Sequence, residues 1–164
     1  MGKVAIIGFA GGIGSGKDCA ANIAEEYGYP KVGFADHLKE SCAFLTGEDM
    51  WSREGKDKEI FKGVTGRKLL ETIGALMRSY DKDFWVKQLF DHHKKCSVCD
   101  VRYGNEVKAI RDLGGVVIKI VREGVQRTGH ESDNWEELDC DYVIENNGTL
   151  EEFKQKIREC IEHL

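Results

Sequence analysis

The sequence predicts an α/β fold built around a mainly parallel, five-stranded sheet. Five short segments have the pattern of strands, the first of them an apolar, β-branched run, and they alternate with stretches whose apolar residues recur at helical spacing. Strands that are joined by helical crossovers form parallel sheets, so this alternation favours a parallel arrangement. The expected strands lie at residues 3–10, 30–35, 96–101, 116–121 and 141–146.

The first expected strand leads into a glycine-rich loop, "GFAGGIGSGKD" at residues 8–18. From Gly11 to Lys17 the loop fits the phosphate-binding pattern G-x-x-x-x-G-K-[ST], but Asp18 replaces the serine or threonine. Helical spacing follows until a stop at Gly28. Strand, loop and helix in this order direct backbone N–H groups at one anion. The expected nucleotide-binding residues are Gly11, Gly12, Ile13, Gly14, Ser15, Gly16, Lys17 and Asp18.

Length, charge and cysteine content narrow the class of protein. The 164 residues suit one domain, expected to span residues 1–164. A net charge of −5 and the lack of a long basic run argue against nucleic acid or a membrane surface as a partner. The six cysteines fall within expected strands and helices, which is typical of reduced thiols. We expect a cytoplasmic protein that acts on small molecules.

Two helical regions complete the expected fold. Residues 36–95 form a long insertion that we expect to be almost entirely helical. Its expected apolar faces are Leu69, Leu70, Ile73, Leu76 and Met77, then Trp85, Leu89 and Phe90. The last helix is expected to start with a capping box between Thr149 and Glu152. Its expected buried residues are Phe153, Ile157, Ile161 and Leu164.

Motifs along the chain carry a resemblance to a known family. The loop alone is similar to that of dephospho-CoA kinase, which ends in serine. The other motifs are "FADHLK" at 34–39, "GRKLL" at 66–70, "DFWV" at 83–86, "DVRYGNEVKAIRDLGG" from Asp100, "HESD" at 130–133 and "DYVIENNG" at 141–148. In this order they resemble the phage deoxynucleoside monophosphate kinases of the P-loop kinase fold. Two residues depart from that pattern, since Asp133 replaces a glutamate and Gly104 a proline.

The resemblance implies ATP-dependent phosphorylation of deoxynucleoside 5′-monophosphates by direct in-line transfer, with Mg²⁺. It assigns residues 36–95 to monophosphate binding and residues 123–139 to a lid. The expected catalytic residues are Lys17, Arg102, Arg122 and Arg127. The expected substrate contacts are Asp36, Lys39, Arg67, Trp85, Arg102, Glu106 and His130, with Arg78 as a candidate outside the motifs. Asn147 is expected to bind ATP near its adenine.

Asp18 and Asp100 are the expected magnesium ligands. A carboxylate at position 18 offers Mg²⁺ a hard oxygen ligand, directly or through a retained water. Asp100 lies at the end of the third expected strand. Each residue has a simpler alternative: Asp18 favours the start of a helix, and Asp100 pairs with Arg102 in a turn.

Several alternatives stay open at this point. Another phosphorylated acceptor, such as dephospho-CoA or phosphomevalonate, suits the same loop and fold. A GTP-dependent switch is disfavoured because the chain has no N-K-x-D motif. Trp85 is a candidate for the core as well as for base stacking, and "HHKKCSVC" is a weak zinc motif because no second cysteine pair follows. A homodimer is compatible with the sequence, as is the host cytoplasm if a phage encodes the chain.

Overall fold

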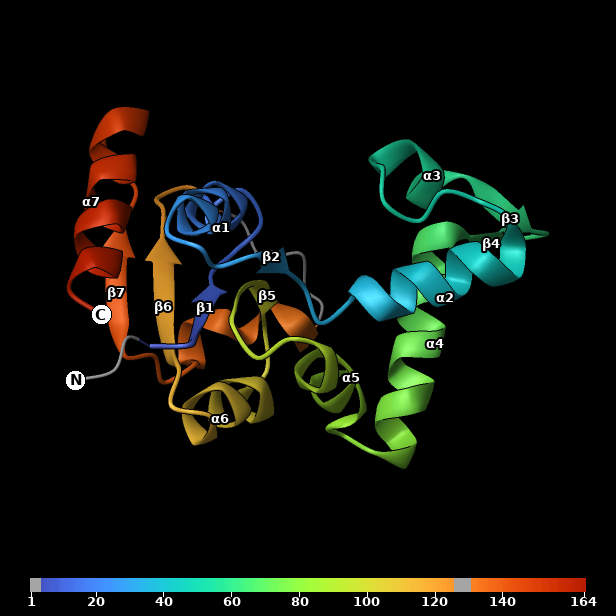
Figure 1. The fold of residues 1–164 in the computed structure, drawn as a ribbon. Coiled ribbons are helices and arrows are strands. Elements are labelled where there is room, and N and C mark those ends of the chain that lie inside the picture. Colours follow the sequence, from blue (N-terminus) through green and yellow to red (C-terminus); the bar gives the residue numbers. More distant parts are fainter. Residues whose placement is uncertain (1–3, 126–130) are drawn as a thin grey trace. The chain divides into compact units, whose positions relative to one another are not determined.

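The computed structural model describes residues 4–125 and 131–164, and of residues 131–133 only the backbone (Figure 1). These residues form two compact units. The first contains the residues up to Gly33 together with His93–Leu164, and the second is Phe34–His92. A single domain over residues 1–164 stays a prediction.

The first unit contains a five-stranded parallel sheet in the order β2-β5-β1-β6-β7 (Figure 1). Its strands are β1 (Ile6–Ala10), β2 (Lys31–Val32), β5 (Cys96–Val101), β6 (Val116–Val121) and β7 (Tyr142–Glu145). The predicted fold class is therefore confirmed. Strand β2 is shorter than expected, because the chain leaves the sheet after Val32 and enters the second unit.

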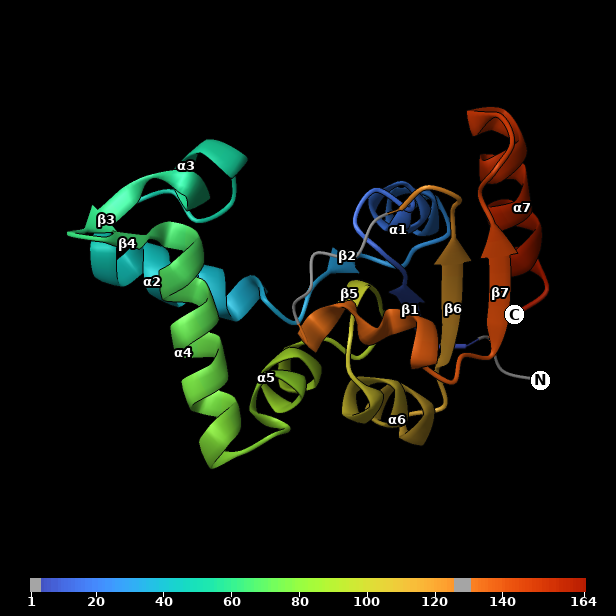
Figure 2. The same ribbon diagram turned by 180° about the vertical axis from the view of Figure 1, so that it is seen from behind.

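Helices of the first unit pack on both faces of this sheet. They are α1 (Lys17–Glu26), α6 (Gly104–Asp112), α7 (Leu150–Glu162) and the 3₁₀ helix η1 (Glu131–Glu137), which Figure 2 shows from the reverse side. Ile110 of α6 packs on the face that Gly8 presents, since a Cβ on Gly8 would lie 2.7 Å from its Cδ1 atom. Alternation along β1 turns Ile7 and Phe9 to the other face.

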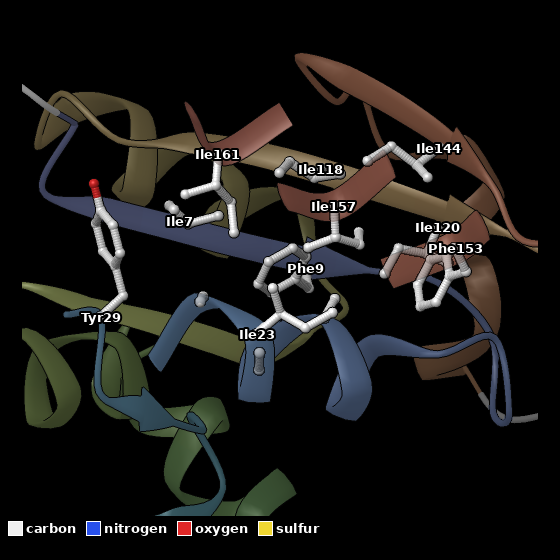
Figure 3. Packing of buried hydrophobic residues seen from close by; sticks show 13 residues of the cluster. Ile7, Phe9, Ile23, Tyr29, Ile118, Ile120, Ile144, Phe153, Ile157 and Ile161 are labelled. Carbon is white, nitrogen blue, oxygen red and sulfur yellow. The ribbon is translucent and has the colours of Figure 1, made fainter. Parts of the chain in front are cut away.

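That other face holds the main core of the unit. Figure 3 shows Ile23 of α1 and Ile157 of α7 near Phe9 of β1, and Phe153 of α7 beside Ile120. The same cluster includes Ile118 and Ile120 of β6 and is almost fully buried. Burial of this apolar surface stabilises the first unit and fixes where α1 begins relative to the end of β1.

The start of α7 confirms the predicted capping box. The Thr149 hydroxyl accepts the Glu152 N–H at 3.2 Å, and the Glu152 carboxylate accepts the Thr149 N–H at 2.6 Å. Phe153, Ile157 and Ile161 are buried as predicted. Leu164 is only partly buried, because the helix ends at Glu162.

The second unit is less helical than the sequence suggests. Its helices are α2 (Asp36–Thr46), α3 (Arg53–Asp57), α4 (Gly66–Tyr80) and α5 (Phe84–His92). Between α3 and α4 lies an antiparallel hairpin of β3 (Glu59–Phe61) and β4 (Val64–Thr65). The turn uses Gly63 at φ 77°, and the Gly63 N–H donates to the Glu59 carboxylate at 2.7 Å. The expectation of an almost entirely helical insertion was therefore wrong.

Two glycines are the most deeply buried residues of helix α4. Gly66 and Gly74 are its buried residues, and a Cβ on Gly74 would lie 3.1 Å from Leu38 of α2. The predicted face of α4 is partly buried, and Leu76 is exposed. By contrast, Trp85, Leu89 and Phe90 of α5 are buried as predicted.

Two general expectations from the sequence can be checked on the same structure. All six cysteines are free, and five lie in helices or strands as predicted. Cys140 lies in the loop before β7, because pairing of that segment starts at Asp141, whose N–H donates to the Val117 carbonyl. Within the described residues, no helix has the length and apolar character that a membrane crossing requires.

Candidate active site

The glycine-rich loop connects the end of β1 to the start of α1. Gly11, Gly14 and Gly16 have φ values of 150°, 79° and 114°, which residues with a side chain rarely adopt. Gly16 is the N-cap of α1, so the first N–H groups of this helix have no acceptor within it. The positive end of the helix dipole therefore lies at the loop, where it favours an anion.

Two side chains from other elements hold this loop. The Asn146 amide donates to the Ser15 carbonyl at 2.8 Å, and a Cβ on Gly16 would lie 2.8 Å from the same amide nitrogen. Trp135 of η1 packs on Gly12, where a Cβ would lie 3.1 Å from the indole nitrogen. A Cβ on Gly12 would lie closer still to Val125, 2.3 Å from its Cγ1 atom. The glycines at positions 12 and 16 are therefore required, because neighbouring side chains occupy the space where a Cβ would lie.

Lys17 is folded back onto the loop. Its ammonium donates to the carbonyls of Gly11 and Gly12 at 2.6 and 2.7 Å. Burial, followed by the charge of Arg102, lowers the pKa of Lys17, although Asp18 and Asp100 act in the opposite direction. The predicted cation and both predicted metal ligands are thus electrostatic neighbours in the first unit.

Ser15 provides a further sign of a polar ligand. Its side chain is fully buried, and its hydroxyl oxygen has no hydrogen-bond partner among the residues that the structure describes. A buried hydroxyl without a partner costs free energy. Together with the positive-φ glycines, the helix start and Lys17, this hydroxyl fits a loop that binds phosphate.

Asp18 forms an ion pair that the sequence analysis did not anticipate. Its Oδ1 atom lies 2.7 Å from Nζ of Lys31, the first residue of β2. The Asp18 side chain is 81% exposed and that of Lys31 27% exposed. Although burial opposes it, the hydrogen bond and charge of Asp18 raise the pKa of Lys31.

The residues present fit a magnesium site of the kind that needs substrate phosphates. The described residues contain no group of three or more His, Cys, Asp or Glu side chains that could hold a metal ion. Mg²⁺ commonly takes one or two carboxylates and completes its shell with water and phosphate oxygens. Asp18, open to solvent beside the loop, and Asp100 at the end of β5 supply two such carboxylates.

Glu106, which is expected to contact substrate, holds the start of α6 in the structure. It is buried, and its carboxylate accepts the N–H groups of Arg102 at 2.7 Å and Tyr103 at 3.0 Å. Burial, and secondarily the charge of Asp100, raises the pKa of Glu106 to about 8, against the effect of these hydrogen bonds. A direct substrate contact by Glu106 stays a prediction, while its bond to Arg102 fixes the backbone of a proposed catalytic residue.

This raised pKa predicts a pH-dependent stability. Because the folded state binds the Glu106 proton more tightly, the stabilisation is complete below the ordinary value of 4.5 and is lost as the pH rises through about 8. We expect Glu106→Gln to flatten the fall in the free energy of unfolding across this range, measured by urea titration at successive pH values. An identical slope in the variant and the wild type would contradict the assignment.

The segments near the predicted lid also reach the loop. Arg122, after β6, donates to the Gly14 carbonyl at 3.3 Å. The Asn147 side-chain oxygen accepts the Glu123 N–H at 2.8 Å and ties the β7–α7 connection to the same segment. Arg122 is thus placed at the loop, and Asn147 beside the segment that follows Arg122. Arg127 and His130 lie outside the described residues.

The predicted acceptor-binding residues lie in the second unit, apart from Arg102, Glu106 and His130. Lys39 pairs with Asp36 at 3.6 Å, and its ammonium lies 4.8 Å from the centre of the Trp51 ring. Arg67 donates to the Asp57 carboxylate at 2.8 Å and is about half exposed. The structure therefore gives each of these side chains a partner within its own unit.

Trp85 and Arg78 lie against Gly74 of α4. The Trp85 indole donates to the Gly74 carbonyl at 3.2 Å, and the residue is buried. A Cβ on Gly74 would lie 3.5 Å from the Arg78 guanidinium. These contacts favour the core interpretation of Trp85 over base stacking.

Comparison with known proteins gives this site a family. The family model described as deoxynucleotide monophosphate kinase matches residues 49–157. The chain belongs to this family. A protein of Acanthamoeba polyphaga mimivirus, named provisionally as a deoxynucleotide monophosphate kinase, is 33% identical over 96% of both chains. The deoxynucleotide monophosphate kinase of Enterobacteria phage T4 is 27% identical over 87% of this chain and 58% of the phage protein.

Solved structures support the same fold. The dephospho-CoA kinase of Campylobacter jejuni has a TM-score of 0.54 at 15% identity and covers 97% of this chain and 96% of its own. The shikimate kinase of Aquifex aeolicus has a TM-score of 0.52 at 14% identity, with 96% of both chains covered. At such identity these likenesses concern only the fold. The predicted resemblance to deoxynucleoside monophosphate kinases is confirmed by the family match.

Sequence reasoning missed three residues at the site of this deoxynucleotide monophosphate kinase family member. Asn146 directly follows β7 and precedes the predicted Asn147. Its position beside a predicted site residue could have identified it from the sequence. Trp135 and Lys31 gave no local signal, because each reaches the loop from an element that is distant in sequence. Only the folded sheet brings them there.

Proposed function

We propose that the chain transfers the γ-phosphoryl group of ATP directly to the 5′-phosphate of a deoxynucleoside monophosphate. The observation that carries this proposal is the loop between β1 and α1, where the buried Ser15 hydroxyl has no hydrogen-bond partner among the described residues and Lys17 lies on the loop carbonyls. Arg102 is a second cation whose charge acts on Lys17, together with the carboxylates of Asp18 and Asp100. Membership of the deoxynucleotide monophosphate kinase family supports the choice of acceptor.

The proposed reaction needs little chemistry from the protein beyond positioning and charge. An oxygen of the acceptor phosphate, already anionic near neutral pH, forms a bond to the γ-phosphorus of ATP. The bond between that phosphorus and the bridging oxygen breaks, and ADP leaves with the electron pair. No strong general base is required, so in-line alignment and cations supply the catalysis.

The family resemblance assigns the roles that we propose for individual residues. Lys17 neutralises the transferring phosphates, and Arg102 holds the acceptor phosphate with its planar fork of donors. Arg122, which is bonded to the Gly14 carbonyl, and Arg127 flank the proposed lid of residues 123–139 and reach the transferring group when it closes. The second unit, with Asp36, Lys39, Arg67 and Arg78, binds the acceptor nucleotide. Asn147 borders the adenine, and Trp85 supports the fold of the second unit.

Asp18 and Asp100 would hold Mg²⁺ together with phosphate oxygens. When bound, the ion would neutralise charge that develops on the phosphates. Asp18→Asn keeps the size of the side chain and removes its charge. We expect turnover to fall and the Mg²⁺ concentration for half-maximal rate to rise, with little change in metal-free ATP affinity. Steady-state rates across a Mg²⁺ series provide the measurement, and an unchanged Mg²⁺ dependence would leave Asp18 a helix-start role only.

A coupled assay of ADP release tests the proposed function. The acceptors to compare are the four common deoxynucleoside monophosphates, dephospho-CoA and phosphomevalonate. We expect a deoxynucleoside monophosphate to accelerate ADP release and the other two acceptors to leave it at the background rate. If none of the deoxynucleotides accelerates it, the proposal fails.

We also propose that the enzyme acts on free nucleotides in the cytoplasm of a host cell. The net charge of −5 disfavours nucleic acid as a partner, and the relatives named above from the mimivirus and phage T4 support a host setting. A homodimer is the assembly we propose to test by sedimentation.

A further inference from the structure

Lys31 forms an ion pair that joins two elements of the first unit, the edge strand β2 and helix α1. Its backbone belongs to β2 and pairs with Ser97 of β5. Its ammonium donates to the Asn22 side-chain oxygen at 3.2 Å as well as meeting Asp18 at 2.7 Å. Asn22 and Asp18 both belong to α1, so this lysine joins the edge strand to the first helix. An ordinary surface lysine, such as Lys108 in its pair with Asp112, is 74% exposed.

The carboxylate that pairs with Lys31 is also the proposed magnesium ligand Asp18. Asp18 directly follows Lys17 and is the residue where the phosphate-loop pattern has its hydroxyl. Its carboxylate meets the ammonium of Lys31 on the edge strand, and its backbone adjoins the loop cation. Because the side chain is 81% exposed, a ligand can approach the carboxylate while Lys31 still holds one of its oxygens.

We propose that Lys31 is a positioning residue for Asp18. The Lys31 ammonium competes with Mg²⁺ for the Asp18 carboxylate and so sets how strongly nucleotide binding depends on the metal. The inference rests on the proposed binding of ATP at the loop. Without metal, Lys31 neutralises Asp18 and limits its repulsion of the phosphates. When Mg²⁺ is present, it neutralises Asp18 in place of Lys31. The Lys31–Asp18 ion pair must be weakened for this to happen, so it lowers the apparent affinity for Mg²⁺.

The test compares the ATP dissociation constant in EDTA with that in saturating Mg²⁺, by calorimetry on the full chain. Lys31→Met removes the ammonium but keeps a side chain of similar length. We expect the ratio of the ATP dissociation constant in EDTA to that in saturating Mg²⁺ to rise about threefold to fivefold, the effect expected of losing a partly exposed ion pair. Lys31→Arg should keep the ratio near that of the wild type, and Lys108→Met is the matched control for loss of a lysine.

A second background separates this role from others. In Asp18→Asn, the change Lys31→Met should leave the ratio unaltered, because the carboxylate is already absent. A rise in both dissociation constants by the same factor would overturn the proposal and make Lys31 a direct phosphate contact. An unchanged ratio in the folded Lys31→Met variant, checked by thermal unfolding, would reduce the pair to a structural link.

The outcome is distinguishable from failure of the proposed function. Wild-type chain that phosphorylates a deoxynucleotide but shows no change of ratio in Lys31→Met rejects the inference alone. Metal-coupled ATP binding that follows Lys31 as expected, without transfer to any deoxynucleotide, rejects the proposed acceptor alone. Absence of ATP binding by the wild type overturns both.

Discussion

Lys17→Ala is expected to lower turnover by roughly 10²-fold to 10³-fold, the cost typical of losing one charged or hydrogen-bonding group that acts on the transition state. In the structure the ammonium bonds to the carbonyls of Gly11 and Gly12. Phosphates in the loop would replace these neutral acceptors with charged ones, which bind a cation more strongly. The gain is greatest when charge moves onto the bridging oxygen, so the effect should fall mainly on kcat.

Steady-state kinetics with ATP varied at saturating acceptor provide the measurement for Lys17→Ala. Lys108→Met, which alters an exposed lysine on α6, should retain wild-type rates. A variant that loses ATP affinity but keeps its kcat would show that Lys17 binds the ground state and the transition state equally, contrary to the proposed role. Thermal unfolding of the variant excludes loss of the folded loop as the cause.

The central strands were predictable because their sequences leave few other solutions. Residues 96–101 and 116–121 are short, mainly apolar runs, and both became strands with those bounds. Strands in the middle of a parallel sheet have helices on both faces, which favours such runs. The capping box at Thr149 was equally local, since its two residues are neighbours in one helical turn.

The missed features depend on contacts between distant residues or on weak local signals. The β3–β4 hairpin is only a few residues long, and Phe61 in it is exposed, so no alternating pattern marked it. The pair of Lys31 with Asp18 exists because β2 lies beside β5, under α1. A single sequence reveals which residues can ionise, but the sheet order decides which of them meet.

In the glycine-rich loop, too, some features could be predicted from the local sequence and others depend on distant residues. Its glycines and Lys17 could be recognised from spacing alone, because the pattern reflects the demands of a phosphate on the backbone. The identity of the side chains that brace it could not, since Asn146 and Trp135 come from the far end of the chain. Together with Val125, they occupy the space in which Gly12 and Gly16 would carry a side chain.

Arg102→Ala is expected to raise the Michaelis constant for the deoxynucleoside monophosphate by roughly 10²-fold, the equivalent of a charge-assisted bond worth ~3 kcal/mol. Arg102 follows Val101, the last residue of β5. Because β5 runs parallel to its neighbour β1, Arg102 and the glycine-rich loop both follow strands at the same edge of the sheet. Its N–H is fixed by the Glu106 carboxylate at 2.7 Å, so its backbone is already ordered before substrate binds. The loss should therefore appear as lost contact with the acceptor.

Kinetics with each substrate varied in turn decide this assignment. The Michaelis constant for ATP should change far less than that for the acceptor, because the proposed function assigns the donor to Lys17 and the loop glycines. Arg102→Lys should fall between, since it keeps the charge without the planar pair of donors. Arg158→Ala, on α7, is the control for loss of an arginine from the first unit. An Arg102→Ala enzyme impaired for ATP and normal for the acceptor would place Arg102 on the donor side, and the acceptor phosphate would then depend on the cations of the second unit.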